Sequence, residues 1–321
     1  MTALFDFAWH GAASVSLRLA GRGNPVLTVD PVFSPHGTYG SWYIPNPHAP
    51  SLADYLAGFA PDVVLVTHGH FDHFDPETIR AIAAARPGCR FGGSAEAVEA
   101  MRSLCDVAPE KSFVLEDGAV YTLPSLAPAT SPATSPATSP ATSPGASPAT
   151  SPGMGSPRND GLPHLRPRAG EHWLTGEEGS KAAAKLAGRP DRYGVMPCGG
   201  PMLGFFIDLP GPGGELITIY ISGDNRLHAF PRGPVDVAIV NFAGLLTHPV
   251  SKEPTKEITG PEDAAAVIDD YLRPRILIPV HWDHDIFLNK VDPADLRASA
   301  EAAVHRTKLV FAPYNRWLAV E

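Results

Sequence analysis

The chain has 321 residues, of which 44% are hydrophobic, and its formal net charge is −9. This composition predicts a globular protein with a sizeable core. Because no long run of lysine and arginine appears, the acidic balance argues against a general nucleic-acid binder. Cys89, Cys105 and Cys198 are too few and too irregularly spaced for a disulfide framework or a cysteine-based zinc knuckle.

The first residues lack a basic segment followed by an apolar run. Elsewhere the chain contains no apolar stretch of the roughly 18 residues that a membrane-spanning helix requires. We therefore expect a soluble, cytoplasmic protein with no membrane span. The sequence carries no signal for an oligomeric state.

The first predicted elements are two strands and a helix. Strands are expected at 26–29 and 63–67, where short apolar runs end in polar residues. A helix is expected at 76–86, since Asp75 is a good N-cap, proline follows in the first turn, and Pro87-Gly88 ends the pattern.

A low-complexity segment follows. The motif Ala-Thr-Ser-Pro recurs over 129–152, and a Gly/Pro/Arg-rich sequence continues to about Arg168. Proline at every fourth position is incompatible with helices and with sheet ladders, so an extended insertion is expected. We place this insertion at 127–168 within a single domain, 1–321, and expect no catalytic role for it.

The second half of the chain again alternates strands with helices. Strands are expected at 216–222 and 235–240, then a helix at 261–272 that Pro274 stops, and a strand at 275–280. The chain is expected to end with a helix and two strands, at 293–304, 308–312 and 316–320.

Each of the main predicted strands ends in polar residues. Asp30 follows the first strand, a histidine cluster the second, and Asp224, Asn241 and His281 follow the later ones. Layered folds of strands and helices gather binding residues at the carboxyl ends of their strands, because the loops there converge on one edge. A site formed by these residues is therefore expected at one edge of the sheet.

The histidine cluster is the most specific signal in the chain. Residues 67–75 read Thr-His-Gly-His-Phe-Asp-His-Phe-Asp, which packs His68, His70, Asp72 and His73 into six positions. Chance would give this pattern only about once in a thousand such chains. Imidazole and carboxylate ligands together suit zinc and its first-row neighbours, whereas calcium and magnesium prefer oxygen ligands. The segment could serve two adjacent ions; the alternative is a polar, histidine-rich loop.

Three motifs together resemble the metallo-β-lactamase fold superfamily: the histidine cluster after a buried strand, Ser222-Gly223-Asp224, and 279–282 with its His281. The resemblance covers nearly the whole chain apart from the insertion. Asp30-Pro31, 199–206 and 220–224 are most similar to the branch containing L-ascorbate-6-phosphate lactonase and N-acyl-phosphatidylethanolamine phospholipase D. The resemblance implies an α+β fold, a four-layer αββα sandwich with a metal site along one edge of its two sheets.

The resemblance also implies a ligand set for two divalent ions, expected to be zinc, with manganese or iron as alternatives. His68, His70 and one further histidine would hold the first ion. His172, in Gly-Glu-His-Trp, is preferred for this third position over His164, which lies in the proline-rich stretch. The second ion would be held by Asp72, His73 and His281, and Asp224 would bridge the two ions.

Other interpretations stay open for several of these residues. Asp224 could belong to an ordinary Gly-Asp turn, and His281 could form a hydrogen bond in a loop. His284 is expected beside the site or at the surface. The glycines at 199, 200 and 204 are expected in tight turns and sheet packing rather than beside a substrate. The remaining histidines are expected to be solvated or hydrogen-bonded, namely His10, His36, His48, His228, His248 and His305.

Metal chemistry then predicts a hydrolase. A metal-bound water with a lowered pKa would attack an ester, lactone, amide or phosphodiester of a small molecule, with Asp72 as a catalytic residue that orients the water or accepts its proton. No Gly-x-Ser-x-Gly motif for a serine nucleophile is present. A di-iron oxidoreductase is one rival, although its motifs resemble His-x-Glu-x-Asp whereas this chain has His70 at the third position. A non-catalytic metal-binding protein is the second rival. Substrate specificity is expected to come from the loops at 33–50 and 242–249.

Overall fold

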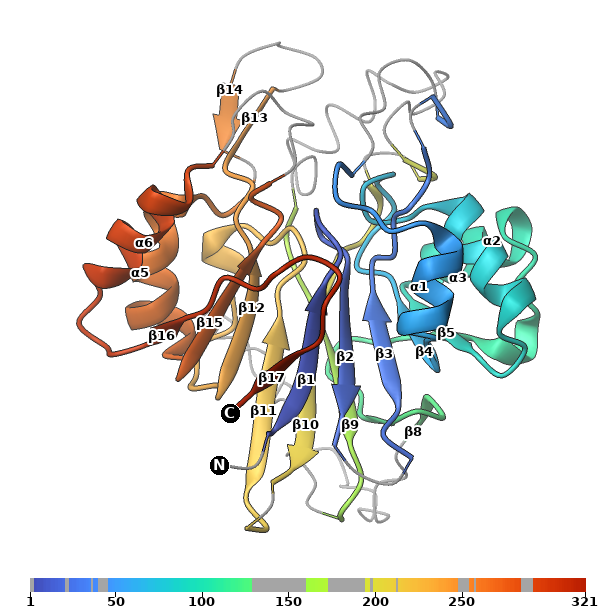
Figure 1. Ribbon diagram of the computed structural model, residues 1–321, viewed down its shortest axis with the longest axis horizontal. Coiled ribbons are helices and arrows are strands. Elements are labelled where there is room, and N and C mark those ends of the chain that lie inside the picture. The colour runs from blue at the N-terminus through green and yellow to red at the C-terminus, as the bar shows by residue number, and fades with distance from the viewer. Residues whose placement is uncertain are drawn as a thin grey trace, which may run out of the picture.

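The computed structural model describes residues 3–20, 23–35, 37–39, 46–128, 160–172, 194–196, 199–211, 213–247, 254–256, 258–283 and 291–321. Within these residues two β-sheets lie face to face, and helices cover the outer face of each sheet (Figure 1). This is the expected four-layer αββα sandwich.

The first sheet has the strand order β17-β1-β2-β3-β4-β5-β6. Its pairs are antiparallel from β17 to β3 and parallel from β3 to β6. The strands expected at 26–29 and 63–67 are β3 and the slightly shorter β4. The members of this sheet are β1 (Phe5–Trp9), β2 (Val15–Leu19), β3 (Val26–Val29), β4 (Val63–Leu65), β5 (Arg90–Gly93), β6 (Ser112–Val114) and β17 (Leu318–Val320).

Three helices pack on the outer face of this sheet: α1 (Leu52–Gly58), α2 (Pro76–Ala85) and α3 (Ala95–Leu104). The expected helix at 76–86 is α2. It begins as predicted, because the Asp75 carboxylate accepts a hydrogen bond from the backbone N–H of Thr78. A short 3₁₀ turn, Pro109–Lys111, precedes β6.

The second sheet has the strand order β16-β15-β12-β11-β10-β9-β7-β8. The strands from β16 to β11 are parallel, and those from β11 to β8 are antiparallel. Its members are β7 (Tyr121–Thr122), β8 (Ala127–Pro128), β9 (His164–Ala169), β10 (Leu203–Pro210), β11 (Leu216–Ile221), β12 (Val237–Asn241), β15 (Ile276–Val280) and β16 (Lys308–Leu309).

Helical segments cover the outer face of the second sheet. The helix expected at 261–272 is present but irregular. It consists of a 3₁₀ turn (Pro261–Asp263), α5 (Ala264–Ala266) and a π-helical turn (Val267–Leu272), and it ends where Arg273 adopts a left-handed conformation with φ of 41°. The last helix, α6 (Pro293–Glu301), is three residues shorter than expected.

Two minor elements complete the described structure. A two-stranded hairpin, β13 (Leu245–Thr247) with β14 (Pro254–Lys256), lies apart from both large sheets (Figure 1). A 3₁₀ turn, Leu227–Ala229, follows β11. Among the described residues, no helix has the length and apolar character needed to cross a membrane.

The main core lies between the two sheets. Alternate residues of each strand point into it, for example Leu17 and Val29 from the first sheet and Phe205 and Ile219 from the second. The other faces of the central strands are also apolar and contact the helices. Strands covered on both faces read as continuous apolar runs, which is why 26–29 and 275–280 were recognised from sequence alone.

The bounds expected for the insertion, 127–168, are too wide at both ends. Residues 127–128 form β8 and residues 164–168 belong to β9, whereas the repeat at 129–152 lies outside the described residues. β9 forms because Leu165 enters the core and the buried Arg166 guanidinium makes two hydrogen bonds, of 2.6 and 2.9 Å, to Asp208. Pro167 is tolerated since β7 pairs with β9 only as far as Leu165. That the insertion interrupts a single domain stays a prediction.

Candidate metal centre

The histidine cluster lies in the loop that leads from β4 to α2. Its backbone is held by a neighbouring segment, because the Gly69 N–H donates to the Gly199 carbonyl (2.7 Å) and the Val195 N–H donates to the Gly69 carbonyl (2.8 Å). The loop then turns sharply, and the N–H of His73 donates to the His70 carbonyl (2.9 Å). This turn points the cluster's side chains in two directions.

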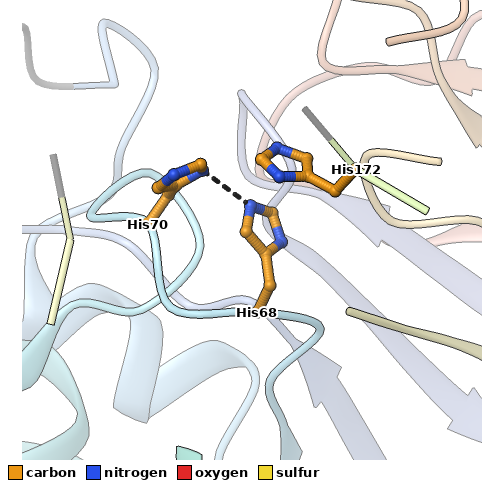
Figure 2. A group of neighbouring side chains, drawn as sticks. All are labelled: His68, His70 and His172. Carbon is orange, nitrogen blue, oxygen red and sulfur yellow. Dashed lines mark hydrogen bonds between the residues drawn. The ribbon is translucent and has the colours of Figure 1, made fainter. Parts of the chain in front are cut away.

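The first group of side chains consists of His68, His70 and His172. One ring nitrogen from each lies within 4.8 Å of the others, and His68 Nε2 is 3.1 Å from His70 Nδ1. All three residues are buried. Figure 2 shows the three rings facing one another, with His172 arriving from a different part of the chain. The structure thus brings together three imidazoles that could hold one ion.

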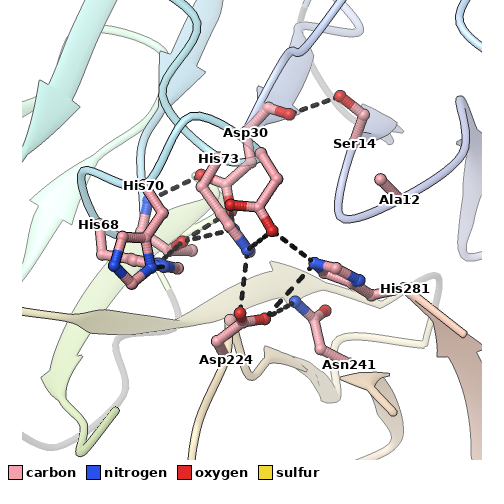
Figure 3. A network of polar contacts seen from close by, with 12 residues as sticks. Ala12, Ser14, Asp30, His68, His70, His73, Asp224, Asn241 and His281 are labelled. Atoms are coloured by element: carbon pink, nitrogen blue, oxygen red, sulfur yellow. Dashed lines mark hydrogen bonds and ion pairs between the residues drawn. The ribbon is translucent and has the colours of Figure 1, made fainter. Parts of the chain in front are cut away.

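The second group consists of Asp72, His73, Asp224 and His281, whose potential ligand atoms also lie within 4.8 Å of one another. Asp72 Oδ2 is 3.4 Å from His281 Nε2 and 3.7 Å from His73 Nε2. Figure 3 shows the carboxylate of Asp224 and the rings of His73 and His281 converging on one point. All four residues are buried.

Asp224 lies between the two groups. Its Oδ2 atom is 3.1 Å from His73 Nε2 in the second group and 3.8 Å from His172 Nε2 in the first. Its Oδ1 atom is 3.8 Å from His281 Nε2 and accepts a hydrogen bond from the Asn241 side chain (2.8 Å). A carboxylate in this position could contact ions held by either group.

The carboxyl ends of strands supply most of these residues, as the sequence predicted. The histidine cluster follows β4, Asp224 follows β11, Asn241 ends β12, His281 follows β15 and His172 follows β9. His281 adopts a left-handed backbone conformation with φ of 59°, and its N–H donates to the Ala12 carbonyl (3.0 Å). A non-glycine residue in this region costs about 1–3 kcal/mol, and such strain is concentrated at functional sites.

Burial and neighbouring charges set the protonation of the site. Burial and the nearby imidazoles hold the pKa values of His68 and His172 well below the ordinary value. Burial alone would raise the pKa of Asp224, but the charges of His73 and His281 hold it well below its usual range. His68 and His172 are therefore neutral and Asp224 is ionised at neutral pH, which are the forms that bind metal ions.

The donor set fits two divalent first-row ions. Neutral imidazoles and carboxylates are the ligands that zinc and its neighbours share, and calcium would require an oxygen-rich shell. For His73 and His281 burial opposes protonation, but Asp224 and the neighbouring carboxylates raise the pKa of both rings. Concentrated negative charge on Asp72 and Asp224 is what a cation in this position would offset.

Asp30 orients one of the histidines. Its carboxylate accepts hydrogen bonds from the N–H and the hydroxyl of Thr67 (2.8 and 2.6 Å) and lies 2.7 Å from His73 Nδ1. These contacts turn His73 so that its Nε2 atom faces Asp224. Sequence reasoning missed the roles of Asp30 and Asn241, although both were noted as polar residues at strand ends, which was the available signal.

His164 does not join the first group. Its ring lies on β9, where Nε2 is 2.8 Å from Asp160 Oδ1. The geometry therefore favours His172 over His164 as the third histidine.

The other histidines within the described residues lie outside both groups. His10 is buried, with its ring nitrogens 2.9 Å from Ser16 Oγ and 3.0 Å from Asn315 Oδ1. His48 stacks on Tyr314 at 3.7 Å. His228 and His305 are exposed, and His36, His248 and His284 lie outside the described residues.

Gly199 does more than form a turn. Its φ is 75°, and a Cβ atom at this position would lie 2.9 Å from His70 Nε2 and 3.1 Å from His68 Cδ2. Glycine is therefore required both by the backbone conformation and by the close approach of this loop to the first group.

The comparisons with known proteins support the fold. The model of the "Beta-lactamase superfamily domain" matches residues 6–135, and no curated protein sequence matches the chain significantly. The structure is similar to that of isothiocyanate hydrolase from Delia radicum gut bacteria (16% identity, TM-score 0.59, covering 98% of this chain and 99% of that chain). It is also similar to a possible metal-dependent hydrolase from Veillonella parvula DSM 2008 (16% identity, TM-score 0.58, 100% of both chains).

A third similar structure is CmlA, a diiron β-hydroxylase from Streptomyces venezuelae (14% identity, TM-score 0.50, covering all of this chain and 55% of that chain). At such identities the likeness shows the fold alone. The metallo-β-lactamase sandwich expected from the sequence is confirmed.

Proposed function

We propose that the protein is a metal-dependent hydrolase that binds two divalent ions, expected to be zinc, with manganese or iron as alternatives. Its reaction is the hydrolysis of an ester, lactone, amide or phosphodiester bond in a small molecule. One observation carries the proposal: seven buried donor side chains from four separate segments converge in two groups that meet at Asp224. Two of the similar structures, those of isothiocyanate hydrolase and of a possible metal-dependent hydrolase, agree with this reaction class.

Each residue has a defined part in this proposal. His68, His70 and His172 would hold one ion, Asp72, His73 and His281 would hold the other, and Asp224 would contribute to both sites. When bound, the ions would supply Lewis-acid activation of a water molecule and of the scissile group. Asp30 and Asn241 keep His73 and Asp224 in the orientations that the two ions need.

Asp72 is the proposed catalytic residue. Burial alone would raise its pKa, but His73 and His281 hold that pKa well below the usual range, so the carboxylate is ionised at neutral pH. An ionised carboxylate within the site can orient the attacking water and accept its proton.

The loop expected to contribute specificity contacts the histidine cluster. Tyr39 stacks on Phe71 with ring centroids 4.2 Å apart, and Phe71 lies between His70 and Asp72 in the chain. The Tyr39 hydroxyl donates to the Asp75 carboxylate, which fixes the stack. We assign this aromatic pair to the wall of the substrate site, and the L-ascorbate-6-phosphate lactonase branch remains the proposed subgroup. The cytoplasmic location stays a prediction.

The test combines metal analysis with a substrate panel. Purified protein should contain two divalent ions per chain, and it should hydrolyse at least one member of a panel of generic esters, lactones, amides and phosphodiesters in a chelator-sensitive manner. Asp72→Asn preserves shape but removes the carboxylate base, and should lower kcat by at least about 100-fold. Asp106→Asn, which changes an exposed aspartate outside both groups, is the matched control.

Two results would replace the proposal by a rival. Bound iron with redox turnover would favour an oxidoreductase. This rival is considered because CmlA, a diiron β-hydroxylase, is one of the similar structures. Stoichiometric metal with no turnover on any substrate class would favour a non-catalytic metal-binding protein. Full activity of Asp72→Asn would remove this residue from the mechanism.

A further inference from the structure

Asn225, directly after Asp224, is buried and hydrogen-bonded at both ends of its side-chain amide. Its Oδ1 atom accepts from the backbone N–H of Glu171 (2.9 Å). Its Nδ2 atom donates to the Tyr220 hydroxyl (3.2 Å) and to the Ala229 carbonyl (3.4 Å). The amide thus connects the turn after β11 with the residue that precedes His172.

This connection holds the backbone beside His172 at two points. The Glu171 N–H donates to Asn225, and the Glu171 carbonyl accepts from the N–H of Arg226 (2.8 Å). Gly170 is also close, since a Cβ atom there would lie 2.8 Å from Asn225 Oδ1. The segment that carries His172 is therefore tied to the residues immediately after Asp224.

The sheet itself does not supply this connection. In the second sheet β10 lies between β9 and β11, so the ends of β9 and β11 are not hydrogen-bonded neighbours. His172 follows β9 and Asp224 follows β11, yet His172 Nε2 lies 3.8 Å from Asp224 Oδ2. The Asn225 amide joins these two loops across the amino-terminal end of β10.

The Asn225 backbone is anchored independently. Its carbonyl accepts from the hydroxyl of Thr259 (2.8 Å), which precedes the helical segment that begins at Pro261. An anchored turn can hold a second loop in place, because its own position does not depend on that loop.

We infer that Asn225 is the positioning residue that sets His172 against Asp224 and so completes the first metal site. The inference rests on the proposed function, in which this group of histidines holds an ion. An amide suits the position because it offers an acceptor on one side and donors on the other. A carboxylate would keep the acceptor but lose the donors, and an aliphatic side chain would leave the Glu171 N–H unsatisfied.

The test measures zinc binding to the full-length protein after its metal has been removed with a chelator. Wild-type protein should bind two ions. In Asn225→Ala the affinity of one ion should fall about 10- to 100-fold, which is typical for the loss of a partner that orients a metal ligand, while the other ion is retained. His172→Ala should lower the affinity for the same ion. The double variant should lose little more affinity than His172→Ala alone, because both changes act on one ligand.

Asn46→Ala is the matched control. Asn46 is also buried and joins two segments, since its Nδ2 donates to the His10 carbonyl (2.7 Å) and its Oδ1 accepts from the His48 N–H (2.9 Å). Within the described residues it has no hydrogen bond or ion pair to any of the seven donors, so Asn46→Ala should bind both ions as the wild type does. A milder variant, Tyr220→Phe, removes only the hydroxyl that accepts a hydrogen bond from Asn225 Nδ2. It should lower the affinity for the same ion by a smaller factor. This variant keeps the test possible if Asn225→Ala does not fold.

Wild-type affinity for both ions in Asn225→Ala or Tyr220→Phe would overturn the inference. An equal loss of affinity for both ions would also overturn it, because it would indicate a purely structural role. These results would not contradict the proposed function. Wild-type protein that binds fewer than two ions would instead overturn the proposed function and the inference together.

Discussion

At the scale of single residues, Gly199 allows its loop to lie close to the first group of histidines, because glycine has no Cβ atom. Gly199→Ala would add a Cβ atom 2.9 Å from His70 Nε2 in a backbone conformation with φ of 75°. We expect weaker zinc binding at the first site, because His70 must move, together with a loss of about 1–2 kcal/mol in the free energy of unfolding from the left-handed conformation. Zinc titration and urea denaturation measure the two effects.

Gly118 provides a matched control for this substitution. Its φ is 74°, and a Cβ atom there would meet no atom of the described structure within 4 Å. Gly118→Ala should show the same loss of stability with unchanged zinc affinity. Unchanged zinc affinity in Gly199→Ala as well would contradict the close packing of this loop against His68 and His70.

His10 should make stability depend on pH. Burial lowers its pKa from 6.5 to about 4, although the hydrogen bond with Asn315 acts in the opposite direction. Because the unfolded chain binds a proton at a higher pH than the folded protein does, the free energy of unfolding should decrease as the pH falls from about 6.5 toward 4. The full contribution is about 3 kcal/mol and is present above pH 6.5.

The check is urea denaturation of wild type and His10→Gln across this pH range, at equal metal loading. The difference in unfolding free energy between the two proteins should vary with pH as described, since other titrating groups contribute to both. A difference that stays constant from pH 7 to pH 4 would show that His10 is not buried in its neutral form.

At the scale of elements, Asp75 connects α2 with the loop expected to contribute specificity. Its carboxylate caps the helix by accepting from the Thr78 N–H and hydroxyl (3.2 and 2.6 Å). It also accepts from the N–H of Phe33 (3.0 Å), from the N–H and hydroxyl of Ser34 (2.9 and 2.7 Å), and from Tyr39. One side chain thus fixes both the start of α2 and the Tyr39 stack.

Asp75→Ala should therefore lower the free energy of unfolding by more than the loss of an ordinary helix cap does. We expect a decrease of about 3 kcal/mol or more in the free energy of unfolding, because several buried donors lose their acceptor. Ser94→Ala removes the N-cap of α3, where Ser94 Oγ accepts from the Ala97 N–H, and should cost about 1 kcal/mol. Equal losses in the two variants, measured by urea denaturation, would show that Asp75 acts only as a cap.

The sequence predicted elements best where local pattern and burial agree. β3 and α2 follow directly from an apolar run and from an N-cap with proline in the first turn. β9 was missed because Pro167 and the adjoining repeat resemble a linker, whereas the strand depends on the Arg166–Asp208 contact, 42 positions apart in the chain. The π-helical turn was also missed, since its apolar spacing resembles that of an α-helix.

At the scale of the whole molecule, the candidate site joins the two sheets. The histidine cluster follows a strand of the first sheet, whereas His172, Asp224 and His281 follow strands of the second. Ions bound here would cross-link the two halves of the sandwich. Metal binding should therefore stabilise the whole fold, as any ligand specific for the folded state does.

All seven donors were named from sequence, and the structure brings them into two adjacent groups. Their role as metal ligands stays a prediction. The spacing of the histidine cluster indicated His68, His70, Asp72 and His73, because metal ligands are restricted to a few residue types, and the resemblance to the metallo-β-lactamase superfamily implied the other three. The spacing could not reveal Asp30, Asn241 or Asn225, whose effects depend on neighbours that only the folded chain supplies.

The central claim is that these donors hold two ions, and metal stoichiometry tests it most directly. The measurement compares wild type with His172→Ala and His164→Ala, purified and metal-loaded in parallel. We expect two tightly bound ions per chain in wild type and in His164→Ala, and one in His172→Ala. Fewer than two ions in wild type, or an ion lost from His164→Ala and retained in His172→Ala, would contradict the account.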